Sequence, residues 1–156
     1  MKEFKYFEEF ISEAEFLLDK YAHFLSDKIE TEQVSFIREN IDKETLISYV
    51  FISNITNDIQ SLLNSKSKNL KLSLDNYLKN RIMHPEVTKS DYLKIPIIIK
   101  NPSKVLKSKN GYDVILFKAD EKYYKLVVKT TASKDENFVK SLHLINYDRY
   151  MKYWIK

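Results

Sequence analysis

The chain of 156 residues has the length of one domain, and its 44% apolar and 31% charged residues are typical of a folded globular protein. It contains no cysteine, which excludes disulfides, thiolate metal sites and cysteine nucleophiles, and its single glycine excludes the glycine-rich phosphate loops that need several. No apolar run approaches the roughly 18 residues of a membrane span, and MKEFKYFEEF at the start is acidic where a signal peptide is basic and then apolar. We therefore expect a cytoplasmic protein without a membrane partner.

The formal net charge of +4 conceals two halves of opposite sign. Residues 1–67 hold 7 Lys and Arg against 13 Asp and Glu, whereas residues 68–156 hold 19 against 9. The basic half favours a polyanionic partner, most often nucleic acid. A lysine-rich surface that only faces water would have the same composition. The sequence predicts two parts, an acidic helical extension over 1–67 and a basic α+β domain over 68–156.

Helical periodicity dominates the first half. Apolar residues recur at helical spacing over Glu3–Leu25, and a second, short helix is predicted over Thr31–Glu39 with Thr31 as its N-cap. Asp42 is predicted to cap a long helix that ends near Leu63. A polar loop over 64–69 then joins the halves, and another helix is expected from about Leu70 to Ile82.

The hydrophobic period changes in the second half. Alternating residues predict three strands, the first two of which form a hairpin, over 112–118, 122–129 and 137–145. Asn146 is expected to cap a closing helix. The stretch 91–99 is compatible with an edge strand or a short helix, because its β-branched run contains Pro96. The predicted class is α+β: N-terminal helices, then an antiparallel sheet of at least three strands, then a C-terminal helix.

His84 is the first candidate for chemistry. Pro85 pushes His84 out of helical geometry, so the preceding helix is predicted to end there and to present the imidazole at its edge. The helix dipole favours a cationic histidine at this end. The plain alternative is a histidine that only caps the helix.

Ser141 and His143 form a second candidate pair, because residues two apart in a strand share one face. The opposite face of the predicted strand is the stronger core candidate, since it carries Phe138, Leu142 and Leu144. Ser141 and His143 are then expected to face outward. The alternative is a pair of partly buried polar residues with local hydrogen bonds.

Basic and aromatic residues alternate on the neighbouring strands, and such interleaving suits phosphates and stacked bases. The candidates for RNA binding are Lys118, Lys125, Lys129 and Tyr123. The alternative is that these lysines line the solvent face and block edge pairing. No spacing of histidines or carboxylates indicates a metal site, and we expect no cofactor.

One reaction, the metal-independent cleavage of RNA, needs only side chains of the kinds named above. RNA is cleaved without metal when its own 2′-hydroxyl attacks the neighbouring phosphate, which requires a base, an acid and cations for the phosphate. Histidine suits either proton-transfer role because its ordinary pKa lies near 6.5.

The second half also resembles a known family. Residues 81–105, RIMHPEVTKSDYLKIPIIIKNPSKV, together with the three predicted strands, resemble the phage-associated branch of the barnase–EndoU–colicin–RelE-like nuclease superfamily over roughly residues 70–150. The resemblance implies a metal-independent endoribonuclease of a phage or mobile element, acting as a toxin or effector. It makes His84 the general base or acid, Lys118 and Lys129 the phosphate ligands, and Ser141 a hydrogen-bond donor to the phosphate. The resemblance assigns no role to His143, which is a candidate only because it shares a strand face with Ser141.

Two hypotheses follow for the whole chain. The first is an RNA-cleaving enzyme, which implies RNA and a cognate inhibitor or host protein as partners. The second is a non-catalytic binder with the same fold, such as a phage-encoded inhibitor of host nucleic-acid machinery. A weaker third hypothesis is that the acidic helices dock a partner protein.

Overall fold

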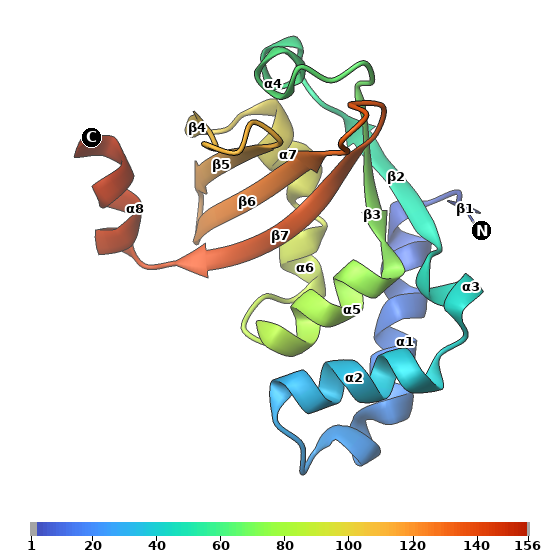
Figure 1. Ribbon diagram of the computed structural model, residues 1–156. Coiled ribbons are helices and arrows are strands. Elements are labelled where there is room, and N and C mark those ends of the chain that lie inside the picture. Colours follow the sequence, from blue (N-terminus) through green and yellow to red (C-terminus); the bar gives the residue numbers. More distant parts are fainter. Residues whose placement is uncertain (1–2, 156) are drawn as a thin grey trace. The chain divides into compact units, whose positions relative to one another are not determined.

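The computed structural model describes residues 3–155 and divides into two compact units, each made of two chain segments (Figure 1). Unit 1 comprises Met1–Ile52 and Lys71–Leu93, and unit 2 comprises Ser53–Leu70 and Lys94–Lys156. The predicted boundary after residue 67 falls inside the first segment of unit 2. The charge asymmetry follows the units: unit 1 holds 10 Lys and Arg against 15 Asp and Glu, and unit 2 holds 16 against 7.

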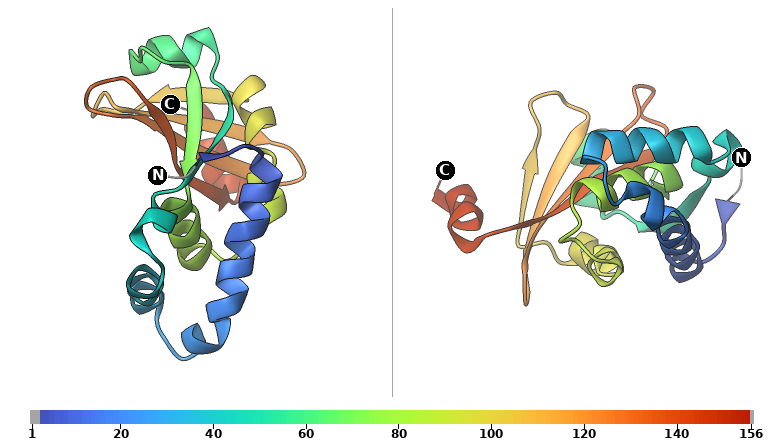
Figure 2. Two further views of the ribbon diagram at one scale, coloured as in Figure 1. Left: turned by 90° about the vertical axis from the view of Figure 1, so that its right-hand side faces the viewer. Right: turned by 90° about the horizontal axis from the view of Figure 1, so that it is seen from below.

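Unit 1 is mainly helical. Its elements are β1 (Glu3–Phe4), α1 (Phe7–Leu25), α2 (Glu30–Asn40), α3 (Lys43–Leu46), α5 (Leu74–Met83) and α6 (Lys89–Tyr92). The apolar stripe of α1 that the periodicity predicts is buried at Phe10, Ile11 and Ala14. Helix α2 lies across α1 (Figure 2), and both helices contact α5.

A polar network connects α1 to α5 and to the loop that follows α5. One carboxylate oxygen of Glu15 accepts hydrogen bonds from the Tyr77 hydroxyl at 2.8 Å and from Nε of Arg81 at 2.9 Å. Nη1 of Arg81 donates to the carbonyl of Val87 at 2.7 Å. The Glu15 and Arg81 side chains are only 19% and 18% exposed, so each charge depends on the other for compensation.

Two tyrosine rings of unit 1 differ in how their hydroxyls are satisfied. The rings of Tyr77 and Tyr92 lie 4.7 Å apart, and both residues are buried. The Tyr92 hydroxyl has no hydrogen-bond partner among the described residues. Burial raises the pKa of both tyrosines above the ordinary value, and the negative charge of Glu15 raises that of Tyr77 further.

Unit 2 combines a β-sheet with short helices. Its elements are α4 (Asn57–Leu63), α7 (Ile95–Lys100), β4 (Lys104–Lys107), β5 (Asp113–Ala119), β6 (Tyr123–Thr130), β7 (Asn137–Ile145) and α8 (Tyr147–Ile155). Leu116, Leu126 and Leu142 lie in register across β5, β6 and β7 and are fully buried. Helices α4 and α7 contact β5, and Nζ of Lys94 at the start of α7 lies 5.7 Å from the centre of the Tyr124 ring. The core of unit 2 therefore occupies the Tyr124 face of the sheet.

Buried amide and ammonium groups join the two segments of unit 2. Nδ2 of the fully buried Asn137 donates to the carbonyls of Ser67 and Asn69, at 2.7 and 3.1 Å. Nζ of Lys134 donates to the carbonyls of Leu63 and Gly111, at 3.0 and 2.9 Å. These bonds satisfy carbonyls of the loop residues Ser67 and Gly111, of the last residue of α4 and of the first residue of a strand at Asn69.

The strands follow the order β1-β2-β3-β7-β6-β5-β4, with β2 over Tyr49–Asn54 and β3 over Asn69–Ser73. The pairs from β4 to β7 are antiparallel, whereas β1 pairs with β2 in parallel. The α+β class, the three predicted strands and the C-terminal helix are confirmed. The prediction of a purely antiparallel sheet is wrong, because the sheet is mixed.

A β-bulge in β7 corrects the predicted faces of that strand. Val127 pairs with Ser141 and Val128 pairs with Val139, so the register passes over Lys140, the extra residue of the bulge. One extra residue turns every following side chain to the other face. Val139 is therefore buried with the core, whereas Phe138 is only half-buried and lies on the face of Ser141.

The predicted long helix from Asp42 to Leu63 is wrong. The structure has α3, β2 and α4 in its place, because the run from Tyr49 to Ile52 is β-branched and aromatic and suits a strand. The side chain of Thr56 then caps α4 by accepting a hydrogen bond from the amide of Ile59. The start of the predicted helix at Leu70 likewise belongs to β3, and α5 begins after its N-cap Ser73.

The ambiguous stretch 91–99 is helical. Thr88 and Asp91 form a capping box that starts α6, and Pro96 lies in the first turn of α7, where its missing amide costs no hydrogen bond. The predicted helix over Thr31–Glu39 is confirmed as α2, but its N-cap is Ile29. Strand β4 was not predicted.

Replacing Glu15 with alanine is expected to lower the free energy of unfolding by about 2 kcal/mol, because Arg81 and Tyr77 lose their shared acceptor. Arg38→Ala is the control, because its bonds to Asp75 at 2.9 and 3.0 Å lie on the exposed surface and are expected to contribute less than about 1 kcal/mol. Urea unfolding at pH 7 measures both. Equal losses would contradict a structural role for the network.

Tyr92→Phe is expected to leave the free energy of unfolding unchanged or slightly higher at pH 7, because it removes an unsatisfied hydroxyl, whereas Tyr77→Phe is expected to lower it by about 1 kcal/mol.

The raised pKa values of Tyr77 and Tyr92 also predict that the protein is destabilised at alkaline pH. Unfolded tyrosines ionise near their ordinary pKa of about 10 while the folded ones stay protonated, so stability falls as the pH rises above about 10.

Each phenylalanine variant should therefore lose less stability than the parent between pH 9 and 11 in urea titrations. Identical alkaline losses in the parent and both variants would show that these tyrosines do not cause the effect.

Candidate functional site

Ser141, His143 and Lys125 are brought together by the pairing of β6 with β7. Nε2 of His143 and Oγ of Ser141 share a hydrogen bond at 2.9 Å. Lys125 stands directly opposite His143 in the register, and Val127 stands opposite Ser141. Directly opposed residues of an antiparallel pair share one face, so an imidazole, a hydroxyl and an ammonium group lie within one small area. All three side chains are half-buried.

The same face carries further positive charge. Lys129 follows Lys125 and Val127 on this face of β6 and is exposed. Among residues 3–155, neither Lys125 nor Lys129 has a carboxylate partner. The nearby carboxylate of Asp113 is 9% exposed and already paired, since Nζ of Lys140 lies 3.0 Å from it. Two lysines of this face are thus left to neutralise an anion.

Helix α8 covers one end of this face (Figure 1). Tyr150 of α8 packs with the buried Phe117 and Ile145, and Asn146 caps the helix by accepting a hydrogen bond from the amide of Arg149 at 2.7 Å. The ring of Tyr123 lies 4.9 Å from that of Tyr150 and contacts Tyr147 as well. Tyr123 is therefore engaged in packing, which leaves its ring less free to stack on a base.

Lys118 lies away from the other predicted RNA-binding residues. It pairs with Tyr124, on the core face of the sheet, whereas Lys125 pairs with Phe117 on the face of α8. Alternate residues of a strand point to opposite faces, so Lys118 and Lys125 cannot contact the same phosphate. The structure brings Lys125 and Lys129 together but separates Lys118 from them.

His84 belongs to unit 1, whereas Ser141 and His143 belong to unit 2. Helix α5 ends at Met83, as predicted from the restriction that Pro85 places on the residue before it, and His84 is its C-cap with φ −132°. The His84 amide donates to the carbonyl of Asn80 at 2.8 Å, and Nδ1 lies 3.6 Å from a carboxylate oxygen of Glu86. One third of the side chain is exposed, so its imidazole is accessible.

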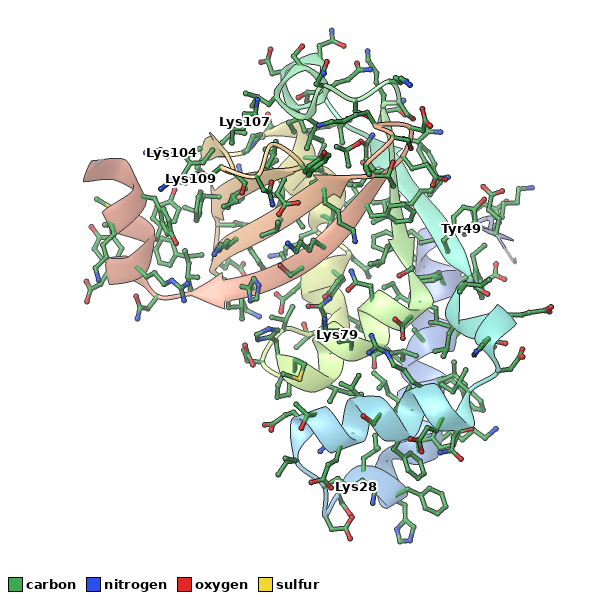
Figure 3. The ribbon with its side chains drawn as sticks, viewed as in Figure 1. Lys28, Tyr49, Lys79, Lys104, Lys107 and Lys109 are labelled. Carbon is green, nitrogen blue, oxygen red and sulfur yellow. The ribbon has the colours of Figure 1, made fainter. Side chains whose placement is uncertain are left out.

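Three further lysines were missed because strand β4 was missed. Lys104 and Lys107 lie in β4 and Lys109 follows it, and their side chains gather at this edge of the sheet (Figure 3). The run Lys104-Val105-Leu106-Lys107 does not alternate between polar and apolar residues, so its periodicity does not predict a strand. Lysines on an edge strand also prevent pairing with a second chain, which explains them without a ligand. Nζ of Lys104 donates to the carbonyl of Tyr153.

The described residues contain neither a metal-binding group nor a membrane-spanning helix. Residues 3–155 contain no group of three or more histidines and carboxylates arranged to hold a metal ion. Over the same range, no helix is long and apolar enough to cross a membrane.

The functional hypothesis rests on the geometry of this chain alone. No family model, no curated protein and no solved structure matches the sequence or the fold. The similarity of residues 81–105 to the nuclease superfamily therefore stays a hypothesis. The hydrogen-bonded pair of Ser141 and His143 is an observation independent of that similarity.

Proposed function

We propose that unit 2 binds RNA on the face of β6 and β7 that carries Lys125, and that it cleaves the RNA as a metal-independent endoribonuclease. The hydrogen bond of 2.9 Å between His143 and Ser141, beside Lys125, is the observation that supports this proposal. It places a proton acceptor, a hydroxyl and a cation in one area. Cleavage by the substrate's own hydroxyl requires a base and cations for the phosphate, which His143 and Lys125 would supply, and an acid for the leaving oxygen.

In the proposed reaction the 2′-hydroxyl of a ribose attacks the adjacent phosphorus. His143 takes the hydroxyl proton, and Ser141 orients the imidazole through their hydrogen bond. Lys125 and Lys129 neutralise the charge that develops on the non-bridging oxygens. The bond to the 5′-oxygen breaks, and the products are a 2′,3′-cyclic phosphate and a 5′-hydroxyl end.

The departing 5′-oxygen requires a proton. The imidazolium formed at His143 carries one, and the nuclease resemblance assigns proton transfer to His84. His84 stays a separate candidate, because it belongs to unit 1 and a third of its side chain is exposed. The resemblance further suggests a toxin or effector of a phage or mobile element, with a cognate inhibitor.

A non-catalytic RNA-binding protein is the second candidate. Unit 2 holds 16 Lys and Arg against 7 Asp and Glu, and Lys125 and Lys129 have no carboxylate partner among the described residues. Both observations favour RNA binding without requiring any proton transfer. Such a protein would act as an inhibitor of host nucleic-acid machinery. Cleavage distinguishes the two candidates.

His143→Ala is expected to reduce the rate of RNA cleavage by about 10²–10⁴-fold, the usual contribution of a general base, while RNA affinity changes little. Ser141→Ala should reduce the rate less, because it removes only the group that orients the imidazole. The assay is incubation with total RNA in EDTA, with detection of 2′,3′-cyclic phosphate ends. His23→Ala is the matched control, because His23 is an exposed histidine on α1 of unit 1.

A His143→Ala protein that cleaves as fast as the parent would overturn the assignment of the base. His84→Ala tests the role that the family resemblance assigns to His84. If His84→Ala loses cleavage while His143→Ala stays active, the proton transfer belongs to His84. Binding of RNA without cleavage by any variant or the parent would favour the non-catalytic candidate.

RNA binding is expected to weaken steeply with salt, because each neutralised phosphate releases condensed counterion. Lys129→Ala should lower the affinity and reduce the slope of log K against log salt concentration by about 0.7–0.9. Lys118→Ala is a charge-matched control on the opposite face and should change the slope less. Fluorescence anisotropy with a labelled single-stranded RNA measures both variants. Equal effects of the two variants would contradict binding on the Lys125 face.

A further inference from the structure

A groove in unit 1 is independent of the proposed RNA site. It has a volume of about 420 Å³ and is bounded by α1, by the first turn of α2 and by the end of α5. Its lining on α1 recurs at helical spacing, at Glu15, Leu18, Asp19, Ala22 and Leu25. One continuous face of a helix therefore forms one side of the groove.

The groove has an apolar floor. Leu18, Leu25 and Ile82 line it, and Ala22 and Pro85 add small apolar surfaces. Apolar surface that lines a groove is typical of a surface that binds another chain.

The charge of the groove is negative. The carboxylate of Glu15 is neutralised by Arg81 at 2.9 Å, so this pair contributes no net charge. Asp19 and Glu30 also line the groove, and neither has a hydrogen-bond or ion-pair partner among residues 3–155. Unit 1 as a whole holds 15 Asp and Glu against 10 Lys and Arg, so the long-range field has the same sign.

We propose that this groove binds a basic amphipathic segment of a partner protein. Aliphatic side chains of the segment contact Leu18, Leu25 and Ile82, and its Lys or Arg side chains pair with Asp19 and Glu30 at the rim. A helix with apolar residues at i, i+3, i+4 and i+7 presents this combination along one side. Charge complementarity identifies the occupant, since an anionic ligand would be repelled by both rim carboxylates.

The test uses the full chain and a fluorescent 14-residue helical peptide of Leu and Lys with this spacing. Fluorescence anisotropy is expected to show saturable binding, and a peptide with Glu in place of Lys should not bind. The double variant Asp19→Lys with Glu30→Lys should weaken binding about tenfold or more, because it turns two attractive pairs into repulsive ones. Ala22→Phe, which fills the groove without changing charge, should weaken binding to a similar extent.

Matched variants control for net charge and for added bulk. Glu9→Lys with Glu13→Lys makes the same change of charge at exposed positions of α1 outside the groove, and Ser12→Phe adds the same ring at an exposed position of that helix. Both controls should bind the peptide within about twofold of the parent. Thermal unfolding of every variant verifies that the protein is folded.

Failure of the Leu and Lys peptide to bind would overturn the proposal. It would equally be overturned if the control variants weakened binding as much as the groove variants, because the attraction would then be a general effect of charge. Sedimentation tests whether a second copy of the chain occupies the groove instead. This alternative requires that the parent is a dimer, that Ala22→Phe dissociates it and that Ser12→Phe preserves it.

Discussion

The register between β6 and β7 is the constraint on which the candidate site depends. The bulge at Lys140 lets Val128 pair with Val139 while Val127 pairs with Ser141, so Val139 enters the core and Ser141 stays on the opposite face. Without the extra residue, one of these two requirements would fail, because side chains alternate strictly along a strand. The bulge thus allows a continuous apolar core and a polar, lysine-bearing face to occupy the same nine-residue strand. Bulges are often found where a strand must re-aim functional side chains.

The two units carry opposite net charge, and each proposal uses the charge of one unit. Unit 2 is strongly basic and has Lys125 and Lys129 without carboxylate partners among the described residues, which suits phosphates. Unit 1 is acidic, and two carboxylates of its groove, Asp19 and Glu30, have no partner among the described residues, which suits a basic peptide. A single +4 net charge would suggest neither, because the two contributions largely cancel. The proposals are separable in experiment, since each rests on side chains of one unit.

Local patterns predicted the elements whose residues interact with near neighbours in the chain. The stripe of α1, the end of α5 before Pro85, the three strands from Tyr112 onward and the cap of α8 at Asn146 were all predicted from short-range rules. The Tyr49–Ile52 run was assigned to a helix because its apolar residues also fit a helical period, and short apolar runs do not distinguish the two structures. Strand β4 was missed because its four residues, Lys-Val-Leu-Lys, do not alternate between polar and apolar.

The sequence by itself determined the α+β class, the sign of the charge in each half, the position of His84 at a helix end, and the pairing of Ser141 with His143 on one strand face. These properties depend on residue type and on spacing over a few positions. Tertiary structure alone decided that Lys125 stands beside His143, that Lys118 lies on the opposite face, and that Tyr123 packs under α8. It also decided the bulge at Lys140 and the groove between α1, α2 and α5. The physical reason is that strand register and helix packing join residues distant in the chain, and their free energy depends on which partners meet rather than on local propensity.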